Sequence, residues 1–148
     1  MKFLGILFLF FASLGIAAQE KKQRIQTTTY LTNRLNTGIK MSVQEAITYK
    51  IKRLLDSLAN KTKGNILLTS TVRFEIENIL YPYWKSSELL GTHTSQAYFI
   101  QTGLQTMTQM DMNSGRLIVM VGLAISKPAE FVFHQYVQII QNKKLVVD

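Results

Sequence analysis

The apolar segment 116–125 limits the fold of this chain more than any other feature. Arg116 is its only charged residue, and Gly122 interrupts a run of large aliphatic side chains. Such a run is typical of a strand with both faces covered, and Gly122 predicts a bulge or the close approach of a neighbouring side chain. Pro128 has no backbone N–H to donate to a ladder, so the strand must end before it. The segment therefore predicts a central strand of a sheet.

A second strand is predicted directly after Pro128, because the side chains alternate between two sets. One set consists of Phe131, Phe133, Gln135, Val137 and Ile139, and the other of Val132, His134, Tyr136, Gln138 and Ile140. Two interpretations remain open. The strand pairs with segment 116–125 as a hairpin, or it adds to the sheet edge of a neighbouring molecule. The alternation alone favours the hairpin.

Two helices are predicted before these strands. In the first, over 41–60, Ser42 and Glu45 have the spacing of a capping box. Its apolar face is formed by Val43, Ala46, Ile47, Ile51, Leu54, Leu55 and Leu58. The second begins with Thr69 or Ser70 as N-cap, and Pro82 should bend or end it.

The remaining segments complete the predicted fold. Residues 96–103 are strand-like, and the sequence 111–115 is typical of a β-turn. The order is helix, helix and three strands. This order predicts an α+β fold with two helices packed on a small, mainly antiparallel sheet.

The N-terminal residues have a different character. Lys2 precedes an apolar run that ends near Ala18 and is too short to span a membrane, which is the pattern of a secretory signal peptide. We therefore predict a signal-peptide-like helix over 1–18, an N-terminal arm over 19–40 and an α+β domain over 41–148. A genuine signal predicts export to the periplasm or the cell exterior.

The composition excludes several kinds of chemistry. The 148 residues carry a net charge of +8 and include no cysteine. Disulfides and thiolate metal sites are therefore excluded. No aromatic–basic motif accompanies the positive charge, so we interpret it as a solvated basic face rather than a nucleic-acid site. His93 and His134 have no carboxylate at ligand spacing, and no phosphate loop or nucleophile elbow is present. We predict no catalytic residue, metal, cofactor or small-molecule substrate.

Residues 66–138 resemble the C-terminal domain of contractile phage-tail sheath proteins and of the sheaths of contractile injection systems. The strongest similarity lies in "SQAYFIQTG", in the spacing V-G-x-A and K-P-A-E-F, and in an acidic residue shortly before a glycine. The residues concerned are Asp111, Gly115, Val121, Gly122, Ala124, Lys127, Pro128, Ala129, Glu130 and Phe131.

The resemblance implies a structural, self-assembling subunit without enzymatic activity. It implies that the strand after Pro128 is lent to a neighbour, which reverses the preference for a hairpin. The implied interface residues are Phe131, Phe133, Tyr136, Val137 and Ile139. The implied partners are other copies or full-length sheath subunits and an acidic inner tube protein, in the cytoplasm or in a virion tail. The alternative hypothesis is a small, exported, monomeric binding protein of the bacterial envelope.

Overall fold

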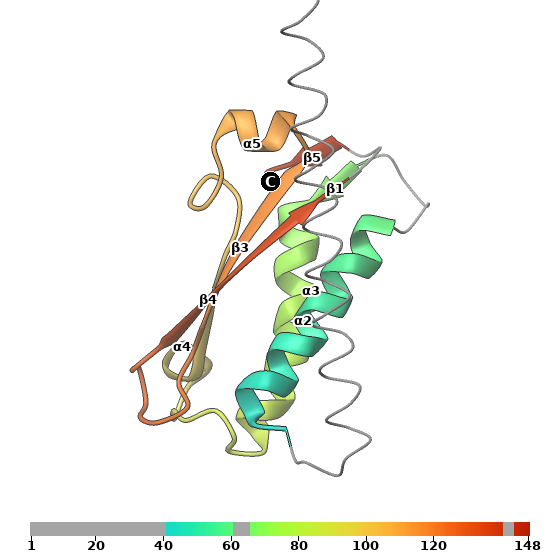
Figure 1. Ribbon diagram of the computed structural model, residues 1–148. Helices are drawn as coiled ribbons and strands as arrows, with labels where there is room; N and C mark the ends of the chain where they lie inside the picture. Colours follow the sequence, from blue (N-terminus) through green and yellow to red (C-terminus); the bar gives the residue numbers. More distant parts are fainter. Residues whose placement is uncertain (1–40, 61–65, 141–143) are drawn as a thin grey trace, which may run out of the picture. The chain divides into compact units, whose positions relative to one another are not determined.

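The computed structural model describes residues 41–60, 66–140 and 144–148 (Figure 1). The helices are α2 (Val43–Asn60), α3 (Thr69–Lys85), α4 (Thr94–Ala97) and α5 (Gln109–Asn113). The strands are β1 (Ile66–Leu68), β2 (Tyr98–Gln101), β3 (Arg116–Leu123), β4 (Val132–Ile139) and β5 (Lys144–Val146). The described strands form an antiparallel three-stranded sheet in the order β2-β3-β4 and a parallel pair of β1 with β5. The predicted α+β class, with two long helices on a small sheet, is confirmed.

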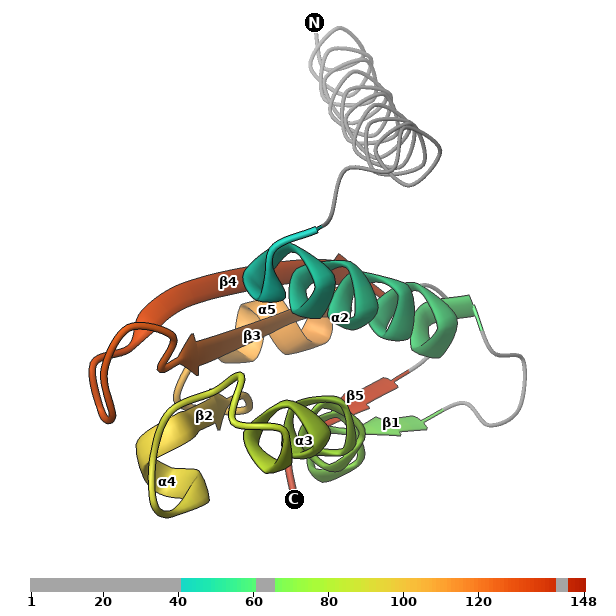
Figure 2. The ribbon, with the colours of Figure 1, turned by 90° about the horizontal axis from the view of Figure 1, so that it is seen from below.

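Helix α2 begins with the predicted capping box. The Glu45 N–H donates to Ser42 Oγ at 3.2 Å, and the Ser42 N–H donates to the Glu45 carboxylate at 3.0 Å. Its apolar face turns toward the sheet, where Ile47 and Ile51 are completely buried. Both helices pack on one face of the sheet, α2 on β4 and α3 on β2 (Figure 2). We call this face of the sheet the inner face.

Helix α3 differs from the prediction at its N-terminus. Its N-cap is Leu68, which makes no side-chain cap, while Thr69 and Ser70 lie inside the helix. The prediction of Thr69 or Ser70 as cap is therefore wrong, because a carboxylate from another part of the chain takes this role. At the other end the helix continues three residues past Pro82 to Lys85. Pro82 has no N–H to donate to the Asn78 carbonyl, and the helix continues for less than one full turn beyond it.

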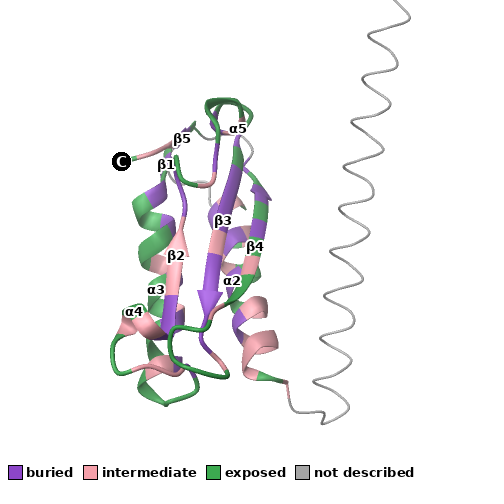
Figure 3. Ribbon diagram, turned by 90° about the vertical axis from the view of Figure 1, so that its left-hand side faces the viewer, coloured by how far each residue is buried: buried purple, intermediate pink, exposed green. Residues whose placement is uncertain are grey.

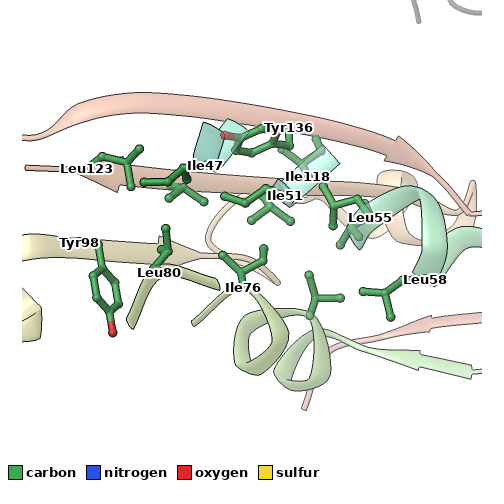
Figure 4. Close-up of a cluster of buried hydrophobic side chains, with 14 of the residues drawn as sticks. Ile47, Ile51, Leu55, Leu58, Ile76, Leu80, Tyr98, Ile118, Leu123 and Tyr136 are labelled. Atoms are coloured by element: carbon green, nitrogen blue, oxygen red, sulfur yellow. The ribbon is translucent and has the colours of Figure 1, made fainter. Parts of the chain in front are cut away.

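Strand β3 is central, as its composition predicts. It pairs with β2 from Met120 to Leu123 and with β4 along its whole length. Its inward side chains form the centre of the core and are completely buried: Leu117, Val119, Val121 and Leu123. Figure 4 shows Leu123 among Ile47, Ile51 and Leu80 from the two helices, with Tyr136 from β4. The core therefore lies between the inner face and α2 and α3.

The parallel pair of β1 and β5 has no counterpart in the sequence predictions. Its register joins Ile66 to Lys144 and Leu68 to Val146, directly before α3 begins. Leu67 and Leu145 at its centre are both buried in the core. This short pair attaches the C-terminal residues beside the N-terminus of α3.

The predicted signal-peptide-like helix over 1–18 and arm over 19–40 lie outside the described residues and stay predictions. Among the helices in the described ranges, none is long and apolar enough to cross a membrane.

Candidate assembly surface

Strand β4 pairs with β3 of its own chain through all eight of its residues, from Val132 opposite Leu123 to Ile139 opposite Arg116. The structure thus shows the hairpin that the alternation alone favoured. Strand β4 is paired within its own chain and is not lent to a neighbour in this structure. Its side chains alternate in burial, with Tyr136 and Gln138 buried and Phe133 and Val137 exposed.

The second edge of β4 pairs with no strand of the described part of the chain. The sequence of β4, VFHQYVQI, contains no Lys, Arg, Asp, Glu or Pro. Proteins commonly place charged residues or proline on an edge strand to prevent strand addition, and β4 has neither. The eight-residue edge can therefore accept a further strand.

The part of β3 that extends beyond β2 is hydrogen-bonded by side chains rather than by a strand. Strand β2 covers only four residues of β3, which leaves Ile118 without a partner strand on that side. The hydroxyls of Thr102 and Thr106 donate to the Ile118 carbonyl at 3.4 and 2.7 Å. Two threonine side chains thus satisfy the Ile118 carbonyl where β3 has no partner strand. The outer edge of β4 has no partner among the described strands.

The outer face of the sheet carries most of the predicted interface residues. In Figure 3 the three strands lie in front of α2 and α3, so neither of these two helices covers this face. Phe133 is 63% exposed, Val137 46% and Ile139 39%. Tyr136 differs, because it is buried on the inner face and its hydroxyl donates to Thr48 Oγ1 of α2 at 3.3 Å. Tyr136, which the resemblance also implies as an interface residue, therefore lies on the inner face of its own sheet, because the alternation of the strand places it in the core.

An aromatic cluster lies at one end of the outer face. The Phe99 ring rests on Gly122, where a Cβ atom would lie only 2.1 Å from Phe99 Cε1. The predicted close approach at Gly122 is therefore confirmed. Phe131 and Phe133 contact the Phe99 ring edge-on, with centroids 5.1 and 5.4 Å away. Phe99 lies in the segment "SQAYFIQTG" on which the resemblance rests, but its contact with Gly122 follows only from the register of β2 on β3.

The motif residues 127–130 form the connection between β3 and β4. Pro128 is followed by Ala129 with φ of 61°, the combination that a type II turn requires at its two central positions. The Ala129 N–H donates to the Gln96 carbonyl at 2.8 Å, and Lys127 and Glu130 form an exposed ion pair at 3.4 Å. Ala124 at the end of the preceding strand is completely buried. These residues fix where the hairpin turns.

Asp111 and Gly115 hold the start of β3. The β-turn predicted over 111–115 is wrong, because these residues belong to α5 and the turn after it. Thr108 and Asp111 form a capping box, and hydrogen bonds from Thr108 hold the pKa of the Asp111 carboxyl below its usual value. Gly115 has φ of 68°, and a Cβ there would lie 2.5 Å from the Ile140 carbonyl oxygen, so only glycine fits.

The described residues offer little for chemistry. No three His, Asp or Glu side chains gather there in a way that could hold a metal ion. His134 lies on β4 with Nε2 buried and without a hydrogen-bond partner among the described residues, and burial lowers the pKa of His134. Burial also raises the pKa of Tyr98 to about 12, so its hydroxyl stays neutral.

The net charge of the described residues differs from that of the whole chain. The described residues contain eight Lys and Arg and eight Asp and Glu, so their net charge is zero. The whole chain carries +8. The positive excess therefore belongs to the N-terminal residues and the two short segments 61–65 and 141–143.

In the described part of the chain, the α+β domain thus combines an uncharged strand edge without a partner strand and exposed apolar side chains on the outer face of the sheet. No family model and no curated protein matches the sequence. Solved structures do. One is the baseplate of the anti-feeding prophage, 31% identical, with 65% of this chain and 27% of that chain covered and a TM-score of 0.49. Another is the PVC sheath complex of an extracellular contractile injection system in the contracted state, with 34% identity, 68% and 28% coverage and a TM-score of 0.47.

The chain thus spans less than a third of the length of these two matched chains. The similarity to these two chains extends over about two thirds of its own length.

Proposed function

We propose that this chain is a structural subunit of a contractile, tail-like assembly and that it associates with other copies through the edge and outer face of β4. The observation that carries the proposal is the uncharged, open edge of β4 beside the exposed side chains of Phe133, Val137 and Ile139. The motif residues in the hairpin turn and the similarity to injection-system components support it.

The strength of one such contact suits a repeated assembly. An added strand of eight residues makes about eight new backbone hydrogen bonds, each worth about 0.5–1.5 kcal/mol net. The sum of roughly 4–12 kcal/mol is offset by the roughly 4–15 kcal/mol that association costs in lost translational and rotational freedom, so two isolated copies would bind weakly. Burial of the exposed outer side chains would add to it. In this proposal a single link is modest, and the assembly gains its stability from repetition.

The added strand comes from another copy or from a longer sheath-type subunit. Because β4 remains paired with β3, it acts as the accepting edge rather than as the strand that leaves. An acidic tube protein, as the resemblance implies, would be bound by the positively charged residues of 1–40, 61–65 and 141–143, since the described residues carry no net charge.

The test replaces an exposed apolar residue of β4 by lysine. Val137→Lys places a charge on the proposed surface, whereas Leu104→Lys, at a side chain that is 72% exposed outside it, is the matched control. We expect the unmodified chain and Leu104→Lys to form oligomers in sedimentation velocity runs and Val137→Lys to shift toward monomer. An unmodified chain that is monomeric at every concentration would contradict the proposal and favour the monomeric binding protein.

A further inference from the structure

The C-terminal residues 144–148 are held on the domain by three separate contacts. Strand β5 pairs with β1 through three residues. Leu145 enters the core with 4% of its surface exposed. Val147 packs beside Gly103, where the space that a Cβ would take lies 3.2 Å from Val147 Cγ1. Each contact is small, and the segment is held by their combination.

A fourth contact comes from Asp148, which caps α3 from 78 residues away. Its carboxylate accepts from the Ser70 N–H at 3.0 Å and from Thr69 Oγ1 at 3.3 Å, and it also accepts from Ser70 Oγ. Leu68 at the N-cap position supplies no side-chain cap of its own. The first N–H groups of a helix lack internal partners and carry partial positive charge, so a carboxylate is well placed there.

The surroundings leave this carboxylate open to solvent. Asp148 is exposed and lines an open hollow of about 400 Å³, whose lining also includes the charged residues Arg73 and Glu77 of α3 and the neutral Thr102 after β2. No described basic side chain forms an ion pair with Asp148. The segment can therefore open locally without disturbing the sheet, since few buried contacts hold it.

We propose that Asp148 is a lock that holds residues 144–148 on α3 of their own chain and so withholds β5, and the edge of β1 that it covers, from other copies. The inference rests on the proposed function, because it concerns when a self-associating chain exposes a further strand. When the lock opens, Leu145 leaves the core and two short strand edges become accessible.

The absence of cysteine makes the lock measurable in the full-length chain. A single cysteine at Leu145→Cys reports opening of the segment through its labelling by a thiol reagent, and Val119→Cys in β3 reports opening of the core. Asp148→Ala should raise the labelling rate of the cysteine at position 145 about fivefold, the effect on an opening equilibrium of removing one side-chain cap. Labelling at position 119 should stay unchanged.

Two further variants keep the test decisive. Ser70→Ala removes one of the three donors to the Asp148 carboxylate and should act in the same direction as Asp148→Ala but more weakly, whereas Glu88→Ala removes an exposed carboxylate outside this hollow and should have no effect. Light scattering on the variants that carry no added cysteine should show faster association for Asp148→Ala than for the unmodified chain.

Equal acceleration at positions 119 and 145, or none at either, would overturn the lock. Selective labelling at 145 with unchanged association would overturn its withholding role. Neither result touches the proposed function, which fails separately if Val137→Lys leaves the oligomers intact.

Discussion

The hairpin of β3 and β4 and the pair of β1 and β5 attach two consecutive parts of the chain's C-terminal region in different ways. Strand β4 makes eight register pairs and sends Tyr136 into the core, while β5 makes three and depends on Leu145 and the carboxylate of Asp148. The hairpin is therefore a fixed part of the domain with an open outer edge. The β5 segment is held by few contacts and, in the proposed lock, opens locally.

The largest difference between the two regions should appear on truncating their core side chains. Tyr136→Ala removes a buried ring and its hydrogen bond to Thr48, and we expect a loss of about 3–5 kcal/mol in the free energy of unfolding. Leu145→Ala should cost less, about 2–3 kcal/mol, because a segment held by few contacts can collapse around the cavity. Urea unfolding measures both values, and a larger loss for Leu145→Ala would contradict the comparison.

A smaller effect is expected from pH at Asp148, directly after β5. Hydrogen bonds from the Ser70 hydroxyl and N–H hold the pKa of the Asp148 carboxyl below its usual value. A carboxyl with a lowered pKa in the folded state stabilises the protein above its unfolded pKa, and this contribution disappears as the pH falls through the folded value.

The unmodified chain should therefore melt at a higher temperature than Asp148→Ala at neutral pH, and the gap should close in acid. Comparing the two chains at each pH cancels contributions that they share, such as those of His134 and Asp111. A gap that is independent of pH would show that the carboxylate is not what holds the segment.

The smallest effect concerns the hairpin turn. Ala129 has φ of 61°, which a glycine adopts without steric cost. Ala129→Gly should raise the free energy of unfolding by about 0.5–1 kcal/mol if relief of this strain exceeds the greater flexibility of glycine in the unfolded chain. Thermal unfolding is the measurement, and a clear loss of stability would mean that the turn is not strained at this residue.

The features that the sequence predicted well depend on local patterns. The capping box of Ser42 and Glu45 is three residues wide, and the apolar run of β3 and the alternation of β4 follow directly from neighbouring residues. Pro128 marks the break between those two strands. Local patterns of this kind reveal helices and strands because each is built from residues close in sequence.

The features that the sequence did not predict depend on contacts between distant residues. Nothing local indicates that Asp148 caps a helix beginning at Thr69, or that Phe99 covers Gly122. Thr108 is the N-cap of the short helix that contains Asp111, and it lies just outside the segment 111–115 that resembled a turn. The interface prediction placed Tyr136 with Phe133 because a resemblance gives positions and not the face of the strand on which each lies.

The most direct test of the account is amide hydrogen exchange followed as the protein concentration is raised. If copies associate by adding a strand to the open edge, protection should increase within Val132–Ile139 and leave Ile66–Leu68 unchanged. Protection that appears outside β4 while the β4 amides exchange as before would contradict the assignment of this edge as the assembly surface.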